Sequence, residues 1–167
     1  MAEPPVSDGP HRIDGLVHPV PIAAIALLVL NDHWGKHAFP GLVTGKLSDV
    51  AGMVFFPLML QAFVELADRR EPFRPSRTVL VTCAVLTGAV FAATNLFPVA
   101  ADAYRVGLGA IQWPFRAVLA ALSGAPAPGL APVHLTMDPT DALTAPFVAV
   151  AVAVGWARTR PRSPPPP

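Results

Sequence analysis

Acids, histidines, lysines and neutral hydrogen-bonding residues gather in four short polar segments of an otherwise apolar sequence. Their members are Asn31, Asp32, His33, Lys36, Thr44, Lys46, Ser48, Asp49, Asn95, His134, Asp138 and Asp141. Lys46 and Asp49 are three residues apart, as are Asp138 and Asp141, so each pair lies on one face of a helix. A carboxylate beside an imidazole can transfer protons, and a lysine can bind an anionic group. The sequence therefore has the residue types for acid–base chemistry or for the binding of a charged ligand.

A divalent metal ion is a second use of the same residue types. His33, Asp49, His134 and Asp141 would provide imidazole and carboxylate ligands of the kind that zinc takes. No fixed-spacing signature such as His-Glu-x-x-His is present, and the single cysteine, Cys83, lies within an apolar run. A divalent metal is therefore one alternative, and the sequence indicates no other cofactor.

The same residues also have a structural explanation. Asp138, Pro139 and Asp141 show the pattern of a helix start, with an N-cap, a proline at the first position and an acid at the third. Lys46 is unfavourable near the positive end of a helix unless an acid such as Asp49 compensates its charge. A network of ion pairs that ties helix ends together is thus the alternative to a binding or catalytic site.

The composition excludes an ordinary soluble domain. Of the 167 residues, 53% are hydrophobic and 14% are charged, whereas about a quarter of the residues in a soluble domain are charged. A net charge of +1 also excludes the strongly basic surface of a nucleic-acid-binding protein. We therefore predict an all-α, polytopic membrane protein whose partner is the lipid bilayer and not a nucleic acid.

Four apolar segments approach or reach the length of about 20 residues that a transmembrane helix needs. They cover residues 19–34, 47–67, 78–97 and 140–157. A further segment, 99–122, has charged residues on one face and apolar residues on the other, which is typical of an amphipathic helix on the membrane surface. A polar-faced fifth span is the alternative for this segment. We expect one transmembrane domain over residues 16–157, between disordered tails at 1–15 and 158–167.

Lysines and arginines are distributed unequally between the two sides of such a bundle. One side has Arg12, Arg69, Arg70, Arg74, Arg77, Arg158, Arg160 and Arg162. The other side has Lys36, Lys46, Arg105 and Arg116. Because cytoplasmic loops have the excess of positive charge, we predict an inner (plasma) membrane protein with both termini in the cytoplasm. The four polar segments then lie at the extracytoplasmic boundary, where they would form a polar cup. Glu65, near the cytoplasmic side, is expected to pair with the arginines of the 68–77 loop.

Three strings of residues together resemble a known family. They are Leu30-Asn31-Asp32-His33, Thr44-Gly45-Lys46-Leu47-Ser48-Asp49 and Asp138-Pro139-Thr140-Asp141. This pattern resembles a family of small, uncharacterised bacterial membrane proteins with four helices, over about residues 16–156. The chain is more faintly similar to VanZ-like membrane proteins, in which charged residues and a histidine end an early helix and an aspartate opens the last. Both resemblances imply a small helical membrane protein, and neither supplies a reaction.

We expect the polar cup to bind a lipid headgroup or another membrane protein of the cell envelope. A membrane-embedded, metal-dependent hydrolase is the first alternative function, and a small transporter subunit is the second. The transporter fits less well, because below the rim the helix interiors contain only Ser, Thr, Cys and Gln as polar residues.

Overall fold

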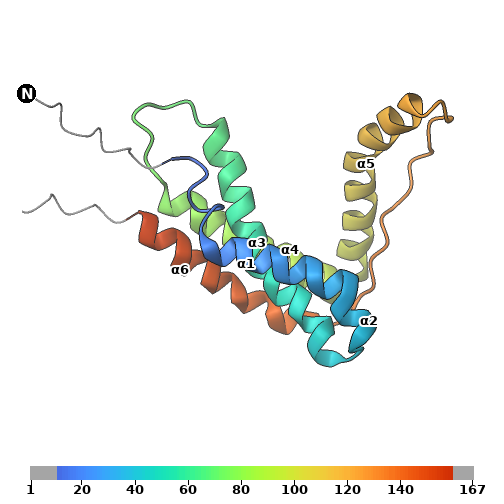
Figure 1. The fold of residues 1–167 in the computed structure, drawn as a ribbon, viewed down its shortest axis with the longest axis horizontal. Helices are drawn as coiled ribbons and strands as arrows, with labels where there is room; N and C mark the ends of the chain where they lie inside the picture. The colour runs from blue at the N-terminus through green and yellow to red at the C-terminus, as the bar shows by residue number, and fades with distance from the viewer. Residues whose placement is uncertain (1–10, 160–167) are drawn as a thin grey trace, which may run out of the picture. The chain divides into compact units, whose positions relative to one another are not determined.

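The structure, a computed structural model, describes residues 11–159 of the chain. This part of the chain is all-helical, and no strand occurs in it (Figure 1). The elements are α1 (Pro19–Leu30), the π-helical η1 (Asn31–Gly35), α2 (Lys36–Ala38), α3 (Leu42–Ala67), α4 (Arg77–Leu96), α5 (Pro98–Leu122), the 3₁₀-helical η2 (Asp141–Phe147) and α6 (Val148–Arg158). The predicted all-α fold is confirmed for the described residues.

The chain forms two compact units, where the sequence predicts a single domain over residues 16–157. Unit 1 contains the chain up to Gly88 and again from Thr144 onward. Unit 2 contains Ala89–Leu143. The helix α4 therefore belongs to unit 1 through its first part and to unit 2 through its second.

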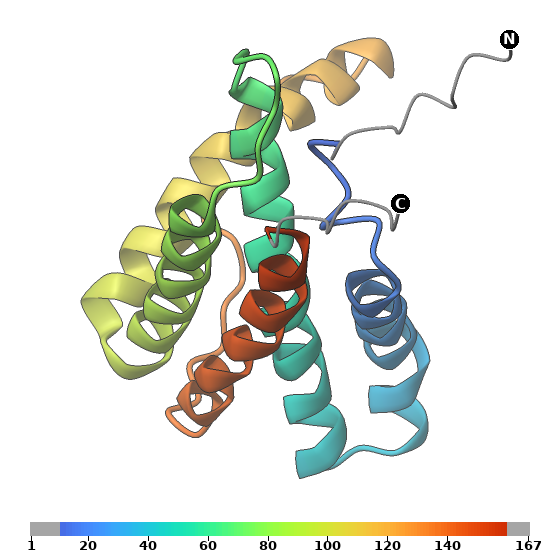
Figure 2. The same ribbon diagram turned by 90° about the vertical axis from the view of Figure 1, so that its left-hand side faces the viewer.

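Unit 1 is built around α3, which packs against α1 and against α6. Figure 2 shows these three helices side by side. The contact with α1 buries Ala24 against Ala51 of α3. The second cluster joins Leu58 of α3, Leu80 of α4 and Ala151 of α6, all with 1% exposure or less. Apolar side chains thus hold four helices of this unit together.

Three helix boundaries differ from the sequence prediction. The first helix does not end at residue 34, because a π-helical turn continues it into α2. The helix α3 begins at Leu42 and not at residue 47, directly after the short connection from α2. The last helix begins as a 3₁₀-helix over Asp141–Phe147. This segment contains Pro146, which lacks the N–H that an α-helical hydrogen bond would need there.

The ends of the described chain are more ordered than predicted. Arg12 donates from Nε to the carbonyl of Asp68 at 3.0 Å, and Gly15 is buried. Arg158 belongs to α6, and Thr159 accepts a hydrogen bond of 2.8 Å from Arg77 Nε. Residues 11–15 and 158–159, which the sequence analysis places in the tails, thus include residues that make defined contacts in the structure. Residues 1–10 and 160–167 lie outside the described part.

Unit 2 consists mainly of α5 and an extended segment that returns along it. The backbone N–H of Val133 donates to the carbonyl of Arg105 at 3.0 Å, and Trp113 Nε1 donates to the carbonyl of Pro128 at 2.8 Å. The helix begins with a proline at its first position, as helices commonly do, and ends before Gly124, whose φ of +72° favours glycine. Its bounds agree with the predicted amphipathic helix at 99–122.

Three helical segments combine the length and the apolar composition that crossing a membrane requires. They are Leu42–Ala67, Arg77–Leu96 and Asp141–Arg158. They correspond to three of the four predicted spans. The segment predicted at 19–34 does not belong to this set, since α1 itself has 12 residues before the π-helical turn begins.

Candidate functional site

The connection between α1 and α3 brings together five of the residues that the sequence singles out. They are Asn31, Asp32, Lys36, Thr44 and Ser48, and we call them the polar turn. Asn31 is 4% exposed, and its Nδ2 donates to the carbonyl of Thr44 at 2.6 Å and to Ser48 Oγ at 2.8 Å. These two bonds join the end of α1 to the first turns of α3.

Ser48 continues this chain of hydrogen bonds to a carboxylate. Its hydroxyl donates to Asp32 Oδ1 at 2.6 Å, and Lys36 Nζ lies 2.7 Å from the same oxygen. Ser48 is buried, whereas the side chains of Asp32 and Lys36 are 39% and 43% exposed. The polar turn therefore links a buried amide to a half-exposed ion pair, and consecutive hydrogen bonds of this kind strengthen one another.

A π-helical turn gives the polar turn its backbone geometry. The N–H of Lys36 donates to the carbonyl of Asn31, five residues earlier. A Cβ on Gly35 would lie 2.6 Å from Asn31 Oδ1, so the side chain of Asn31 requires glycine at this place. Single π-helical turns within α-helices are frequent at functional sites. No motif in the sequence predicts this turn. Its only local requirement is the glycine at position 35, which leaves room for the side chain of Asn31.

Exposed apolar side chains surround the polar turn. Trp34 and Phe39 form an edge-to-face pair with ring centroids 5.7 Å apart, and they are 64% and 65% exposed. Leu42 and Val43, in the first turn of α3, are also exposed. The hydroxyl of Thr44 donates to the carbonyl of Phe39 at 2.8 Å, which fixes the connection below these side chains. The polar turn is thus bordered by an apolar surface.

Three other predicted residues of unit 1 lie nearby. The ring Nδ1 of His33 is 2.9 Å from the carbonyl of Val29, within its own helix, and the residue is exposed. Lys46 and Asp49 occupy half-buried positions on α3, on either side of Ser48 in sequence, and each is engaged with other residues. The hydrogen-bonded chain of Asn31, Ser48 and Asp32 does not include His33.

Unit 2 contains the remaining predicted residues. Asn95 Oδ1 accepts a hydrogen bond of 3.2 Å from the N–H of Asp138. Asp138 Oδ1 in turn accepts from the N–H of Thr140 at 2.8 Å, and its carbonyl accepts from the N–H of Asp141 at 2.9 Å. Asp138 thus accepts from the N–H expected of an N-cap, but the bonds form a turn over Asp138–Asp141, and the 3₁₀-helix begins only at Asp141. His134 is exposed and lies 3.3 Å from the hydroxyl of Thr136. The meeting of both groups of residues in one cup stays a prediction.

The described residues give no support to the predicted metal ligands. Over residues 11–159, no group of three or more His, Cys, Asp or Glu side chains is arranged to hold a metal ion. His33 and Asp49 belong to unit 1, and His134 and Asp141 belong to unit 2.

A buried polar cluster in unit 1 was not expected from the sequence. Gln61 Nε2 donates to Glu65 Oε1 at 2.7 Å, and Arg158 Nη2 lies 3.5 Å from Glu65 Oε2. Gln61 and Glu65 are 1% and 3% exposed. The predicted pairing of Glu65 with arginines of the 68–77 loop is therefore wrong, because α6 brings Arg158 to it. The spacing of Gln61 and Glu65, four residues apart on α3, is the signal that could have indicated a shared face.

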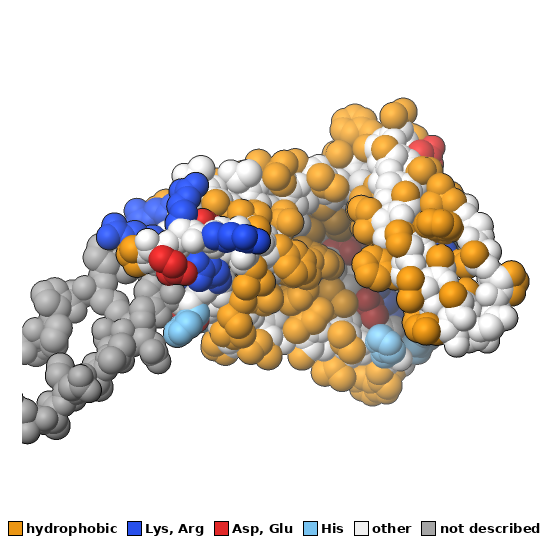
Figure 3. All heavy atoms as spheres, turned by 90° about the horizontal axis from the view of Figure 1, so that it is seen from above, with side chains coloured by type: hydrophobic (Ala, Val, Ile, Leu, Met, Phe, Trp, Pro, Cys, Tyr) orange, Lys and Arg blue, Asp and Glu red, His pale blue; other side chains and the backbone are white. Residues whose placement is uncertain are grey.

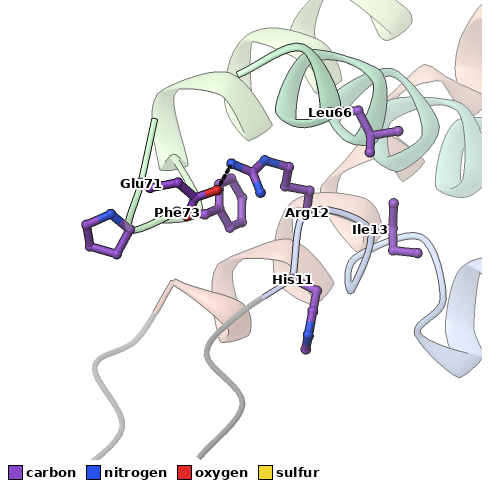
Figure 4. A pocket seen from close by; sticks show the side chains of 7 residues that line it. His11, Arg12, Ile13, Leu66, Glu71 and Phe73 are labelled. Carbon is purple, nitrogen blue, oxygen red and sulfur yellow. Dashed lines mark hydrogen bonds and ion pairs between the residues drawn. The ribbon is translucent and has the colours of Figure 1, made fainter. Parts of the chain in front are cut away.

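A pocket of about 450 Å³ lies where the N-terminal segment meets the loop after α3. Figure 4 shows the guanidinium of Arg12 directed at Glu71, with Nη2 donating to Oε1 at 2.7 Å. Hydrogen bonding from Arg12 holds the pKa of the Glu71 carboxyl below its ordinary value. Arg12 also lies over the ring of Phe73, 4.9 Å from its centroid. The pocket combines one charged pair with apolar side chains such as Leu66.

Arginines gather at this end of unit 1. Figure 3 shows blue Lys and Arg side chains together there. Arg77 lies over the ring of Trp156, 4.7 Å from its centroid, and Arg158 Nη2 donates to the carbonyl of His11 at 3.0 Å. Residues that the sequence assigns to one side of the membrane are thus brought together within unit 1.

Comparison with protein-family models, curated proteins and solved structures finds no match to this chain. The described fold and the polar turn define an all-helical protein, three of whose helices could cross a membrane.

Proposed function

We propose that this protein is a multi-pass inner-membrane protein whose polar turn binds the headgroup of a phospholipid. Three helical segments that could cross the membrane support the membrane location. The fourth span of the proposal is the helical stretch from Pro19 to Ala38, which is continuous through α1, η1 and α2. The π-helical turn would then lie close to the membrane–water boundary.

The arginines at one end of unit 1 support an orientation with both termini in the cytoplasm. Arg12, Arg77 and Arg158 all make contacts at this end. The excess of positive charge marks the cytoplasmic side of membrane proteins. In this arrangement α5 lies on the membrane surface, where the exposed side chains of Ile111 and Phe115 would contact lipid.

Headgroup binding rests on one observation: the half-exposed Asp32–Lys36 ion pair and the exposed rings of Trp34 and Phe39 belong to the same short connection between α1 and α3. Tryptophan is enriched at the level of lipid headgroups, with its ring at the apolar boundary. The ammonium of Lys36 can bind the phosphate of a headgroup, and the carboxylate of Asp32 can bind the amine of the same headgroup. The polar turn therefore suits a zwitterionic headgroup such as that of phosphatidylethanolamine.

The proposed family relationship is consistent with this site. Asn31 and Asp32 belong to the first string of the family pattern, and Thr44 and Ser48 belong to the second. In the polar turn these four residues are joined by hydrogen bonds. The pattern thus describes residues that contact one another in this chain, and the proposed relationship to that family of small bacterial membrane proteins rests on the sequence pattern itself.

Lipid binding can be measured on the purified full chain by native mass spectrometry with added phosphatidylethanolamine. Lys36→Met should weaken binding by about tenfold, because one charge-assisted hydrogen bond contributes about 1.5 kcal/mol. Arg116→Met, an exposed cation on α5, is the matched control and should bind as the unaltered protein does. Equal binding by all three proteins would refute headgroup recognition by the polar turn.

The topology is tested separately by cysteine labelling in intact cells, in a Cys83→Ala background. A membrane-impermeant thiol reagent should reach Lys36→Cys from outside the inner membrane. It should reach Arg70→Cys only after the membrane is made permeable. Labelling of position 36 from the cytoplasmic side alone would overturn the proposed orientation.

A further inference from the structure

The buried cluster of Gln61, Glu65 and Arg158 leaves three polar atoms without hydrogen bonds to any described residue. They are Gln61 Oε1, Glu65 Oε2 and Arg158 Nε. All three belong to unit 1. A buried polar atom that lacks a partner destabilises the fold, so three in one cluster require an explanation.

The guanidinium of Arg158 lies between fixed neighbours. Arg158 Nη2 donates to the carbonyl of His11 at 3.0 Å, which ties the guanidinium to the N-terminal segment. Gly15 has no Cβ, and a Cβ there would collide with Arg158 Nη1. Arg158 Nη2 lies 3.5 Å from Glu65 Oε2, which is a long ion pair.

The orientation of Gln61 follows from the charge of Glu65. An ionised carboxylate only accepts hydrogen bonds, so the amide of Gln61 must direct its NH₂ group at Glu65 Oε1. The amide oxygen of Gln61 then cannot bond to the carboxylate and needs a donor. The three atoms therefore require a group with two donors and one acceptor.

We propose that Gln61, Glu65 and Arg158 form a binding site for one water molecule inside unit 1. A water molecule donates to the two oxygens and accepts from Arg158 Nε, and buried waters commonly make about three hydrogen bonds. Ions match the cluster less well. The guanidinium repels a cation, the carboxylate repels an anion, and the two charges of the cluster already balance. A neutral ligand with this set of hydrogen bonds is required, and water is the smallest.

The site has a consequence for the membrane-facing part of the chain. Glu65 lies near the end of α3, and Arg158 is the last residue of α6. The water completes the connection between these two helix ends, as well as the one from Arg158 to the N-terminal segment. This role is independent of lipid binding by the polar turn, which involves different residues of unit 1.

A structure of the full chain in lipid nanodiscs, at a resolution that resolves water, tests the proposal. We expect one peak within about 2.7–3.2 Å of all three atoms. Gln61→Leu should abolish this peak while leaving the helices in place, and Gln112→Leu, at an exposed position on α5, should retain it. If Gln61→Leu does not fold, the map of the unaltered protein decides alone. No peak between the three atoms, or a direct bond from Arg158 Nε to Glu65 Oε2, would overturn the proposal.

Discussion

The hydroxyl of Ser48 donates a 2.6 Å hydrogen bond to Asp32 Oδ1, although the two residues are sixteen positions apart in the sequence. Ser48 is buried on α3, and Asp32 belongs to the π-helical turn after α1. The bond fixes Asp32 Oδ1, and the same oxygen forms the ion pair with Lys36 Nζ. The geometry of the surface ion pair is therefore set by a buried hydroxyl.

Replacement of that hydroxyl should be measurable. Ser48→Ala should lower the free energy of unfolding in detergent by about 1 kcal/mol, because Asn31 and Asp32 each lose one hydrogen bond. Thermal unfolding followed by circular dichroism measures the change. Ser123→Ala, at an exposed position after α5, is the control and should leave the melting temperature unchanged. Equal effects of the two substitutions would contradict a structural role for the polar turn.

The contact of α6 with α4 depends on a glycine. A Cβ on Gly155 would lie 2.6 Å from Leu80 Cδ1, and Leu80 is fully buried. Gly155→Ala should therefore destabilise the protein by about 1–3 kcal/mol through overpacking. In a chain that already contains Leu80→Ala, Gly155→Ala should cause little further decrease in the free energy of unfolding. Gly107→Ala, which meets no atom within 4 Å, should be neutral or slightly stabilising. If Gly107→Ala lowered the free energy of unfolding as much as Gly155→Ala does, the packing explanation would be contradicted.

The return segment of unit 2 lies against another glycine. A Cβ on Gly109 would collide with the carbonyl oxygen of Ala131. Gly109→Val should displace this segment and break the hydrogen bond from the Val133 N–H to Arg105. Hydrogen exchange at Val133 should then become at least about tenfold faster, which corresponds to about 1.4 kcal/mol of local stability. Unchanged exchange at Val133 would show that the segment does not depend on this contact.

Removal of Arg158 should leave the Glu65 carboxylate without a partner charge. Arg158→Met should destabilise the protein by about 3 kcal/mol, since breaking a buried ion pair leaves one charge uncompensated. Arg69→Met is a control at an exposed arginine, and its effect should be within about 0.5 kcal/mol. The double replacement Glu65→Gln with Arg158→Met should recover part of the loss. Denaturant titration in detergent measures all four proteins, and absence of recovery would contradict the ion-pair explanation.

The N-terminal segment should detach in acid. The pKa of Glu71 is lower in the folded protein than in the unfolded chain, because Arg12 donates a hydrogen bond to its carboxylate. The contribution of this pair to stability is therefore present above the unfolded-state pKa, near 4.5, and is lost as the pH falls through the folded-state pKa. The hydrogen-exchange protection factors of residues 11–15, taken relative to the intrinsic exchange rate at each pH, should fall over this range. Glu71→Gln should make these protection factors insensitive to pH there, and persistent sensitivity would assign the effect to another group.

Several features could be predicted because they depend on residues close in sequence. Long apolar runs favour helices, so three helical segments long and apolar enough to cross a membrane, and the helix α5, appear near their predicted bounds. The hydrogen bond from the Thr140 N–H to Asp138 is local as well, although the helix itself begins only at Asp141. The candidate residues Asn31, Asp32, Lys36 and Ser48 were recognised for the same reason: polar side chains are rare in this chain and stand out.

Features that depend on contacts between distant segments could not be predicted in this way. The π-helical turn at Asn31 requires the carbonyl of Thr44 and the hydroxyl of Ser48 opposite it, and no local spacing specifies these. Glu65 has several arginines closer in sequence than Arg158, yet the packing of α3 against α6 selects Arg158. The sequence by itself determined an all-helical chain with long apolar segments and a few polar positions, because hydrophobic periodicity is local. The tertiary structure alone decided which polar side chains meet, because hydrogen bonds of 3 Å depend on the packing of whole helices.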